Sequence, residues 1–585
     1  MRRYCSLAGL TLALAAFVLA ADKPDAAPDP LRLVPEQAEF VLQITQPRRL
    51  GETAVHHDLV KQLRTLEAVQ ELYDSTNFRR FYQLLAHFEK EMGARWPEML
   101  DRVAGGGIVV AAKFGGMDAP ALLVVQSKDE AALRKFIDTA GRLLEDELAR
   151  QEAKEKPEKL TYRNTAVLRV GKDFHVAVAG GALLVSNQEK PLQLAIDLHL
   201  DGGKQSVLEK ASVKEARQLA LNGQPDALAW MWLDADTIRS RNPKEGGLDP
   251  KATDPQATVL FGGWLDQFRR TPFLCGVLHE RAGKIVLGLR TPCGREGMDE
   301  SLAALHAPSA EQGGALPLLE PKGTLFSISY TLDTKELWER RAKLFNEAQL
   351  KDFEQFDKST SPLIGGNKPS WLLSAAGPHH RFVAAHRQND LYAKKPGVRL
   401  PAFAVVVAMR DPKEFTQIAE TALRTAALAG LTQVKMKLVE EKHGGLKIVG
   451  YRFPDDAGLE DDAADIRFNF MPCFVSVGNQ FVVSSTFELA HELVDLLQKE
   501  AKGDPVKSET AMRMRFYPSG AADYLQSVED QLLAQTILDR AIGPKEARAE
   551  VQKLLSVIRS SGVLEIEQQF APREFRYDFK YLPKR

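Results

Sequence analysis

The chain has 585 residues, with 77 Lys and Arg against 78 Asp and Glu, a formal net charge of −1, and a hydrophobic fraction of 44%. This composition excludes a disordered chain, a collagen-like repeat and a disulfide-stabilised miniprotein, and the charge balance gives no basic excess for nucleic-acid binding. The length predicts roughly two to four domains, each large enough to bury a core.

The first 20 residues predict a secretory signal peptide. Two arginines precede the apolar run Ala8 to Leu19, which is too short to span a bilayer comfortably, and small residues at its end suit cleavage after Ala20. Residues 21–30 are rich in Pro, Asp and Ala and predict a flexible lead-in. We therefore expect an exported protein, periplasmic or extracellular, whose mature chain has no transmembrane segment.

The rest of the chain repeats a pattern. Pro35 and Pro321 each open an alternating apolar run, and the sequence from Pro120 to Asp129 (PALLVVQSKD) recurs in similar form from Pro401 to Asp411 (PAFAVVVAMRD). Further pairs follow in the same order at a spacing of about 285 residues. This recurrence predicts an internal duplication.

We expect two homologous α+β repeats, at residues 31–296 and 317–585, joined by a linker at 297–316. Gly180-Gly181 and Glu280 to Gly283 predict tight turns between adjacent strands, so each sheet should be largely antiparallel, with helices packed on it. In chain order, strands of the first repeat are expected near 39–45, 107–114, 120–126, 161–170, 174–187, 226–233 and 273–291, and helices near 54–92, 129–153, 189–200 and 210–221.

Four segments carry a resemblance to a known family. They are the opening P-x-x-x-x-F-V-L-Q-I after Pro35, the strand-to-helix step P-A-L-L-V-V-x-x-K-D, the hairpin A-G-G-A-L-L-V-S-N and the strand D-A-L-A-W-M-W-L. With these, the chain resembles a family of exported bacterial proteins classed only as a domain of unknown function. The resemblance implies no activity and transfers no catalytic residue.

Trp230 and Trp232 lie two residues apart on a predicted strand and could form a stacking platform for a sugar ring. The alignment of residues 227–233 with 511–517 gives Met514 and Phe516 as their counterparts, which do not suit such a platform. This comparison favours core packing for both tryptophans.

The sequence contains no G-x-S-x-G elbow, Walker loop or paired C-x-x-C motif, so we assign no catalytic residue and no cofactor. His491 begins a run similar to a zinc-protease helix, but its fourth-position partner is Asp495 rather than a second histidine. His379, His380 and His386 cluster locally, although only the last two would share one face of a strand.

The cysteines of the expected mature chain leave two alternatives open. Cys275 and Cys293 could form a disulfide in an oxidising compartment. Cys275 and Cys473 each lie in an apolar, strand-like run, which favours small buried thiols instead.

An acidic insertion in the second repeat is the remaining candidate site. It is either a mobile solvated loop or a weak calcium site, because carboxylates are suitable calcium ligands but the regular EF-hand spacing is missing. Its carboxylates are Asp455, Asp456, Glu460, Asp461, Asp462 and Asp465.

These observations favour a non-enzymatic binding or structural module with a protein or cell-envelope partner. One alternative is a hydrolase with scattered carboxylates in a groove between the halves, since such carboxylates leave no local motif. Another alternative is a carrier of an apolar ligand, which would need a continuous apolar cavity behind one sheet.

Overall fold

The computed structural model describes residues 27–116, 118–150, 157–221, 226–241, 255–308, 313–364, 366–387, 391–431, 436–455, 465–503 and 508–584. The chain divides into two compact units. Unit 1 comprises Met1–Gly246 and Thr271–Pro292, and unit 2 comprises Gly247–Arg270 and Cys293–Arg585. The predicted signal peptide, residues 1–20, lies outside the described residues.

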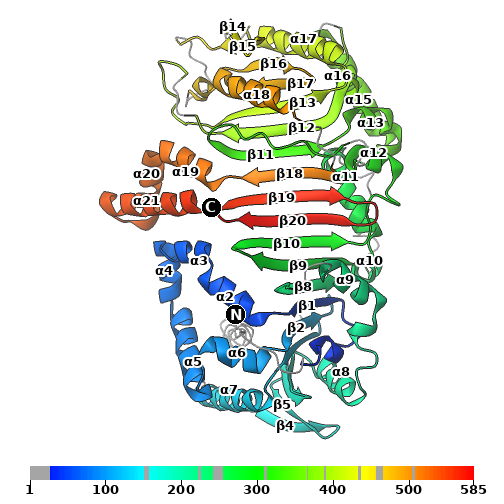
Figure 1. Ribbon diagram of the computed structural model, residues 1–585, viewed down its shortest axis with the longest axis vertical. Coiled ribbons are helices and arrows are strands. Elements are labelled where there is room, and N and C mark those ends of the chain that lie inside the picture. Colours follow the sequence, from blue (N-terminus) through cyan, green and yellow to red (C-terminus); the bar gives the residue numbers. More distant parts are fainter. Residues whose placement is uncertain are drawn as a thin grey trace. The chain divides into compact units, whose positions relative to one another are not determined.

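Unit 1 combines helices with short strands (Figure 1). Helix α5 illustrates the local rules, since Ser75 Oγ accepts a hydrogen bond from the Phe78 amide at its start and Gly93 ends it with a φ of +66°. The elements are η1 (Pro30–Leu33), β1 (Phe40–Ile44), α2 (Pro47–His56), α3 (Asp58–Leu63), α4 (Glu67–Asp74), α5 (Thr76–Met92), α6 (Trp96–Ala104), β2 (Gly107–Ala112), β3 (Ala121–Gln126), α7 (Glu130–Arg150), β4 (Pro157–Tyr162), β5 (Thr165–Val170), β6 (Phe174–Ala179), β7 (Ala182–Ser186), α8 (Glu189–Leu200), η2 (Val207–Glu209), α9 (Ala211–Leu221), β8 (Ala229–Leu233), α10 (Ala235–Arg241), β9 (Leu274–Arg281) and β10 (Lys284–Thr291).

The strands of unit 1 form an antiparallel sheet in the order β4-β5-β6-β7-β3-β2-β1-β8-β9-β10. Gly180 and Gly181 connect β6 to β7 with φ angles of +56° and +72°, as a tight hairpin turn requires. Both turns expected from the sequence are confirmed, because β9 and β10 also pair across Ala282-Gly283.

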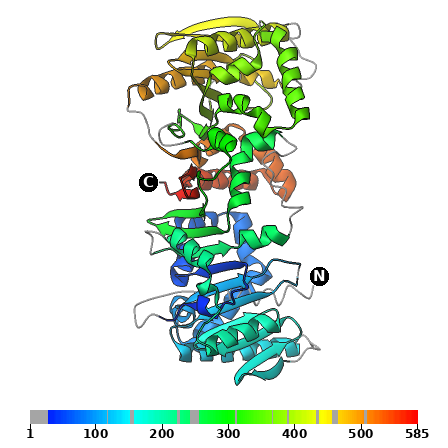
Figure 2. The same cartoon turned by 90° about the vertical axis from the view of Figure 1, so that its right-hand side faces the viewer.

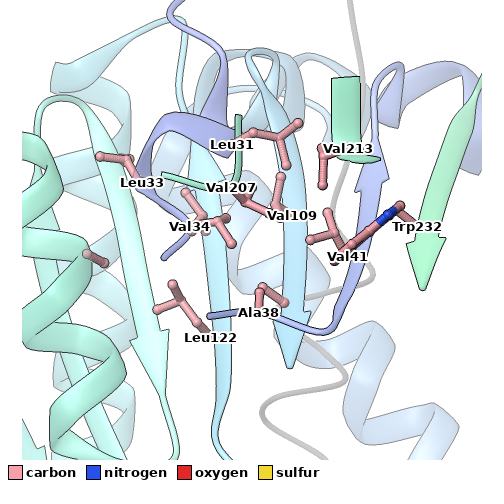
Figure 3. Packing of buried hydrophobic residues seen from close by; sticks show 14 of the residues in the cluster. Leu31, Leu33, Val34, Ala38, Val41, Val109, Leu122, Val207, Val213 and Trp232 are labelled. Atoms are coloured by element: carbon pink, nitrogen blue, oxygen red, sulfur yellow. The ribbon is translucent and has the colours of Figure 1, made fainter. Parts of the chain in front are cut away.

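The main core of unit 1 lies on one side of this sheet. Val41, Val109 and Trp232 point from neighbouring strands toward Leu31 of η1 and Val213 of α9, and all five are buried (Figure 3). A second cluster lies on the other side of the sheet, where apolar side chains of α5, α6 and α7 pack against Ile108 of β2, Val125 of β3 and Leu183 of β7. Helices therefore cover both sides of the unit 1 sheet, although the second cluster covers only part of its side.

Unit 2 has its own set of elements. Its helix α15 begins with a capping box in which the Asn346 and Gln349 side chains each accept the other residue's backbone N–H. The elements are α11 (Pro255–Arg270), α12 (Glu300–His306), β11 (Thr324–Thr331), α13 (Thr334–Glu339), α14 (Arg341–Leu344), α15 (Glu347–Thr360), η3 (Ser361–Ile364), α16 (Pro369–Ala375), β12 (Ala376–Ala385), β13 (Ala402–Met409), α17 (Pro412–Leu431), β14 (Lys437–His443), β15 (Leu446–Arg452), η4 (Ile466–Asn469), β16 (Cys473–Val477), β17 (Gln480–Ser484), α18 (Phe487–Glu500), β18 (Thr510–Phe516), α19 (Pro518–Ser527), α20 (Glu529–Arg540), α21 (Pro544–Ser560), β19 (Val563–Phe570) and β20 (Phe575–Leu582).

The strands of unit 2 pair antiparallel in the order β14-β15-β16-β17-β13-β12-β11-β18-β19-β20. This order matches that of unit 1 strand for strand, and in both units helices follow the first, third, seventh and eighth strands along the chain. The fold class is α+β, as predicted. A duplication would produce this shared order, and the common origin of the two halves stays a hypothesis.

Helices cover the two sides of the unit 2 sheet differently. The apolar stripe of α18 packs on one side, against strands β12, β13, β16 and β17. Helices α16 and α17 pack on the other side at one end of the sheet, and α11 to α15 pack beside β19 and β20 at the other end. The view in Figure 2, turned by 90°, shows helices on both sides of the strands.

The unit boundaries differ from the predicted repeats. Helix α11 was expected within the first repeat but belongs to unit 2, where the Trp264 ring lies 4.9 Å from that of Phe575 and 4.6 Å from that of Tyr577. Helix α12 occupies part of the predicted linker, residues 297–316. Apolar packing decides to which unit α11 and α12 belong. The spacing of the repeats along the chain does not reveal this packing.

The register corrects the predicted alignment of the tryptophan strand. Val41 pairs with Trp232 in unit 1, and Ser327, at the matching place on the opening strand, pairs with Arg515 in unit 2. Trp232 therefore corresponds to Arg515 and not to Phe516. A shift of one residue moves a side chain to the opposite side of a sheet, so this difference changes which residues are buried.

The last part of the predicted flexible lead-in is fixed. Asp29 accepts a hydrogen bond from the Leu31 amide at 3.1 Å and pairs with Arg217 at 2.6 Å. Among the described residues, no helix combines the length and the apolar character needed to cross a membrane.

Candidate functional site

Six strands of unit 2 lie side by side in the order β13-β12-β11-β18-β19-β20 (Figure 1). They carry an apolar surface on one side of the sheet. Ile328 lies opposite Phe382 on one neighbouring strand and Met514 on the other, while Val405 and Ile566 extend the same row outward. We call this surface the apolar sheet face. It consists of Phe326, Ile328, Phe382, Phe403, Val405, Met514, Phe516, Leu564, Ile566 and Phe579.

Solvent reaches much of the apolar sheet face. Leu564 is 49% exposed, Phe403 42% and Phe516 39%. The ten side chains are apolar, and hydroxyl groups border them, because Tyr581 pairs with Leu564 and Tyr330 follows Ile328 on the same side of β11. Soluble proteins seldom expose a contiguous apolar patch of this kind unless it binds something, so the face is a candidate binding surface.

The opposite side is polar on β11, β18, β19 and β20, whereas on β12 and β13 it is apolar apart from Arg381 and packs against α18. Ser327 and Arg381 are 1% exposed and Ser329 is fully buried. Arg381 donates from Nη1 to Glu500 Oε2 at 2.6 Å and to the Pro317 carbonyl at 3.2 Å. A sheet with one solvated side normally buries its apolar side chains and exposes its polar ones. Strand β11 reverses that arrangement, whereas β13 buries the apolar Ala404 and Val406 on this side.

Ion pairs hold the polar side of β18, β19 and β20 together. Glu565 is 8% exposed and accepts hydrogen bonds from Arg515 Nε at 2.5 Å and from Lys580 Nζ at 3.2 Å. Burial alone would raise the pKa of Glu565, but the hydrogen bond and charge of Arg515 and the charge of Lys580 outweigh it and lower the pKa below its ordinary value. The carboxylate is therefore a charged partner of two cations.

The extended chain from residue 313 to 321 lies beside this polar side. The Ala315 amide donates to the Thr510 carbonyl at 2.7 Å, and Glu320 accepts hydrogen bonds from Arg515 and from the Tyr517 hydroxyl. Strand β18, which lies between β11 and β19, thus has polar partners on this side of the sheet. Its apolar side chains point to the opposite side.

The structure confirms core packing for the two tryptophans. Trp230 is 1% exposed and Trp232 is fully buried, and the Trp230 indole N–H donates to Gln43 Oε1 at 2.8 Å. They offer no stacking platform to a ligand.

The clustered histidines have separate surroundings. His380 Nε2 lies 2.9 Å from the Leu332 carbonyl and its ring stacks on Tyr330 at 5.4 Å. Burial, with smaller contributions from the charges of His380 and Arg381, lowers the pKa of His379 to about 4. His386 lies apart from these contacts, in a pocket beyond the end of β12.

The His491 segment has partners that the sequence did not reveal. Its Nε2 lies 3.1 Å from Glu441, and the His443 ring stacks on the His491 ring at 4.5 Å while its own Nε2 lies 2.8 Å from Asp495. In the part of the chain that the structure describes, no group of three or more His, Cys, Asp or Glu side chains is arranged to hold a metal ion. The cluster is thus two histidine–carboxylate pairs between β14 and α18.

Two members of the predicted calcium site fall within the described residues. Asp455 lies 3.5 Å from Arg452, and Asp465 lies 2.7 Å from Lys394 and 3.1 Å from Arg467. The other four, Asp456, Glu460, Asp461 and Asp462, lie outside the described residues. Calcium binding by this loop stays a prediction.

The described cysteines are thiols, and Cys275 and Cys473 are buried, as the second of the two alternatives predicts. No disulfide joins Cys275 to Cys293, and Cys275 and Cys473 are buried in their strands. Burial raises the pKa of the Cys473 thiol, which keeps it protonated.

Comparisons with known proteins give little further guidance. No protein-family model and no curated protein matches the chain. Two solved crystal forms of TP0453, forms I and III, are 11% and 10% identical to it, cover 49% of this chain and 89% and 90% of their own, and have TM-scores of 0.24 and 0.25. These scores are too low to carry an argument about fold or function, and the resemblance to an exported family stays a prediction.

Proposed function

We propose that this protein is an exported, non-enzymatic binding protein, and that the apolar sheet face of unit 2 binds the hydrocarbon chains of a lipid-like amphiphile. The observation that carries the proposal is the reversal of polarity in unit 2, where Ser329 and Arg381 are buried while Phe403 and Leu564 face solvent. Covering exposed apolar side chains stabilises a complex by about 25 cal/mol for each Å² removed from water. The signal-peptide pattern of residues 1–20 supports export.

The chemistry of the face favours hydrocarbon chains over a protein partner. Protein interfaces typically contain a hydrogen bond for every 100–200 Å² or so, together with a polar rim. The ten residues of the apolar sheet face offer only aromatic rings, aliphatic groups and one thioether, and the Tyr330 and Tyr581 hydroxyls lie at its border. A hydrocarbon chain makes no demand for hydrogen bonds, so it fits this surface without leaving a polar group unpaired.

A matched pair of leucine variants tests the proposal. Leu564 lies on the apolar sheet face and is 49% exposed, whereas Leu538 on α20 lies outside it and is 77% exposed. We expect Leu564→Asp to weaken binding of a fluorescent fatty-acid probe by about tenfold or more, because a carboxylate in contact with hydrocarbon loses hydration. Leu538→Asp should bind the probe like the unchanged protein.

Thermal melting of both variants serves as the control for folding, because both leucines are exposed and neither substitution should lower the melting temperature appreciably. Equal probe affinity in Leu564→Asp and Leu538→Asp would exclude the apolar sheet face as the binding surface. Absence of probe binding, combined with stable capture of one purified envelope protein that Leu564→Asp abolishes, would replace the amphiphile by a protein partner.

A further inference from the structure

A pocket with an empty volume of about 520 Å³ lies beyond the ends of β12 and β13 in unit 2. Six of its lining residues, Arg387, Leu391, Tyr392, Lys394, Pro396 and Arg399, come from residues 387–399 of the connection between β12 and β13, which is longer than the chain that joins β2 to β3 in unit 1. The described lining includes three cationic side chains, Arg387, Lys394 and Arg399, and no carboxylate. Two of these cations pair with carboxylates outside the lining, Arg387 with Glu492 and Lys394 with Asp465, so their charge is partly neutralised.

Arg387 is the distinctive residue of this pocket. Its side chain is only 9% exposed, yet its Nε and Nη2 atoms are buried without a hydrogen-bond partner among the described residues. Nη1 is held in place, since it donates to the Lys322 carbonyl at 2.7 Å and lies 3.2 Å from Glu492 Oε1. Glu492 is fixed in turn because its Oε2 accepts the Lys322 amide hydrogen at 2.9 Å.

The two unpaired donors point to a particular ligand chemistry. Nε and Nη2 lie along one edge of the planar guanidinium and direct parallel N–H groups outward, which is the arrangement that binds two oxygens of one phosphate or carboxylate. A buried donor without a hydrogen-bond partner destabilises the protein. A ligand that accepts hydrogen bonds from both donors removes this penalty, which favours its binding.

Other polar side chains of the lining already have partners. The Tyr524 hydroxyl donates to the Arg399 carbonyl at 2.9 Å, and Asn469 Nδ2 donates to the Val398 carbonyl at 2.8 Å. Lys394 lies 2.7 Å from Asp465, which neutralises part of its charge. The Nε–Nη2 edge of Arg387 is thus the part of the lining that most lacks a partner.

We infer that this pocket is an oxyanion-binding site that takes a phosphate group, and that Arg387 recognises it through two parallel hydrogen bonds. Because Nε and Nη2 have almost no contact with solvent, phosphate binding requires a rearrangement of the side chains around Arg387. The site rests on residues other than those of the apolar sheet face and stands independently of the proposed function.

Calorimetric titration of the mature protein with inorganic phosphate tests the site. Arg387→Lys keeps the charge but removes the two-donor edge, so we expect it to weaken phosphate binding by about tenfold to a hundredfold. Arg387→Met should abolish binding. Arg573→Gln, at a residue whose side chain is 87% exposed, is the control and should bind like the unchanged protein.

The source of the phosphate is decided by two further ligands, dihexanoyl phosphatidic acid and the uncharged dihexanoylglycerol. Tighter binding of the phosphatidic acid than of inorganic phosphate, lost in Arg387→Met, supports a site for a lipid headgroup. Equal affinities support a site for a free phosphate. Leu564→Asp should leave inorganic phosphate binding unchanged, which separates this site from the apolar sheet face.

Thermal melting shows whether each variant is folded. If Arg387→Met has a lowered melting temperature, the phosphate affinities of Arg387→Lys and Lys394→Ala are compared instead. Arg387→Lys loses the two-donor edge, whereas Lys394→Ala loses only a partly neutralised charge. Arg387→Lys should then show the larger loss. Undetectable phosphate binding at millimolar concentration, or equal affinity in the unchanged protein and a folded Arg387 variant, would overturn the inference.

Discussion

The central strands of the two units bury opposite kinds of side chain although the strand order is the same. In unit 1, Val41 and Trp232 pair across β1 and β8 and are fully buried in an apolar core. In unit 2 the corresponding pair is Ser327 and Arg515, within a polar network. The comparison teaches that this topology does not dictate which side of its central strands is apolar.

The difference has a consequence for the other side of each sheet. In unit 1 the side opposite the core is also largely apolar, but Leu42 and Met231 are half-buried, and Leu287, at 43%, is the one exposed large apolar residue on the described strands of that side. In unit 2 the apolar sheet face has five residues exposed by 39% or more: Phe403, Val405, Phe516, Leu564 and Phe579. The polar network of β18 to β20 thus coincides with the exposed Phe516, Leu564 and Phe579, whereas Phe403 and Val405 are exposed on β13, whose other side is apolar.

The largest expected effect is on the apolar core of unit 1. Trp232→Ala should lower the unfolding free energy of unit 1 by about 3–5 kcal/mol, because it removes a fully buried indole and leaves a cavity. Hydrogen exchange of peptides from β1 and β8 in increasing urea measures this. Phe516→Ala in unit 2 should cost far less, and equal losses for the two variants would mean that the contrast in burial does not govern stability.

The polar network of unit 2 should also be sensitive, by a different mechanism. Arg381→Ala removes the cation paired with Glu500 and leaves polar groups near it without their partner, so we expect a loss of about 2–4 kcal/mol. The double change Arg381→Met and Glu500→Met should recover much of this loss, since replacing a buried ion pair by apolar side chains is often neutral. No recovery in urea unfolding would show that the network stabilises unit 2 through more than this pair.

The sequence predicts the strands of both units better than the side that each strand buries. Alternation in Phe326, Ile328 and Tyr330 marks a strand, and this strand exists as β11. The same alternation places Ser327 and Ser329 on the other side, but a period of two does not tell which side faces water. That choice depends on the ion pairs among distant residues and on the chain at 313–321.

The candidate sites show the same limit. His491 and Asp495 are adjacent on one helix, but their contacts with Glu441 and His443 come from a strand about 50 residues earlier. Arg387 has no motif around it, and its significance comes from its burial and its unpaired donors. Long-range packing creates these features, so no local pattern could have identified them.

Acidification should destabilise unit 2 through His306. Burial lowers the pKa of His306 to about 4 in the folded chain, against an ordinary value near 6.5. The unfolded chain therefore binds the proton more readily, and stability is full above pH 6.5 and falls as the pH drops toward 4. At pH 5 the loss should be about 2 kcal/mol.

Urea unfolding followed by hydrogen exchange in α11 and α12 at pH 7 and pH 5 measures this dependence. In His306→Gln the difference between the two pH values should shrink by about that amount. An unchanged pH dependence in this variant would show that other groups control the acid response of unit 2.

The smallest effect is expected at an exposed ion pair. Arg573 and Glu296 lie 3.0 Å apart with side chains 87% and 60% exposed. Solvent and salt screen such a pair, so Arg573→Ala should leave the melting temperature of the protein unchanged within error. A clear decrease would indicate that Arg573 has a role beyond this pair.

The central claim is that the apolar sheet face of unit 2 binds hydrocarbon chains, and photo-crosslinking tests it most directly. A fatty acid carrying a diazirine at the end of its chain is bound to the mature protein, activated by light and located by peptide mass spectrometry. The account predicts crosslinks in residues 326–328, 382, 403–405, 514–516, 564–566 and 579, lost when an unlabelled competitor is in excess. Competable crosslinks confined to the exposed apolar residues of α20 and α21, or the absence of any competable crosslink, would contradict it.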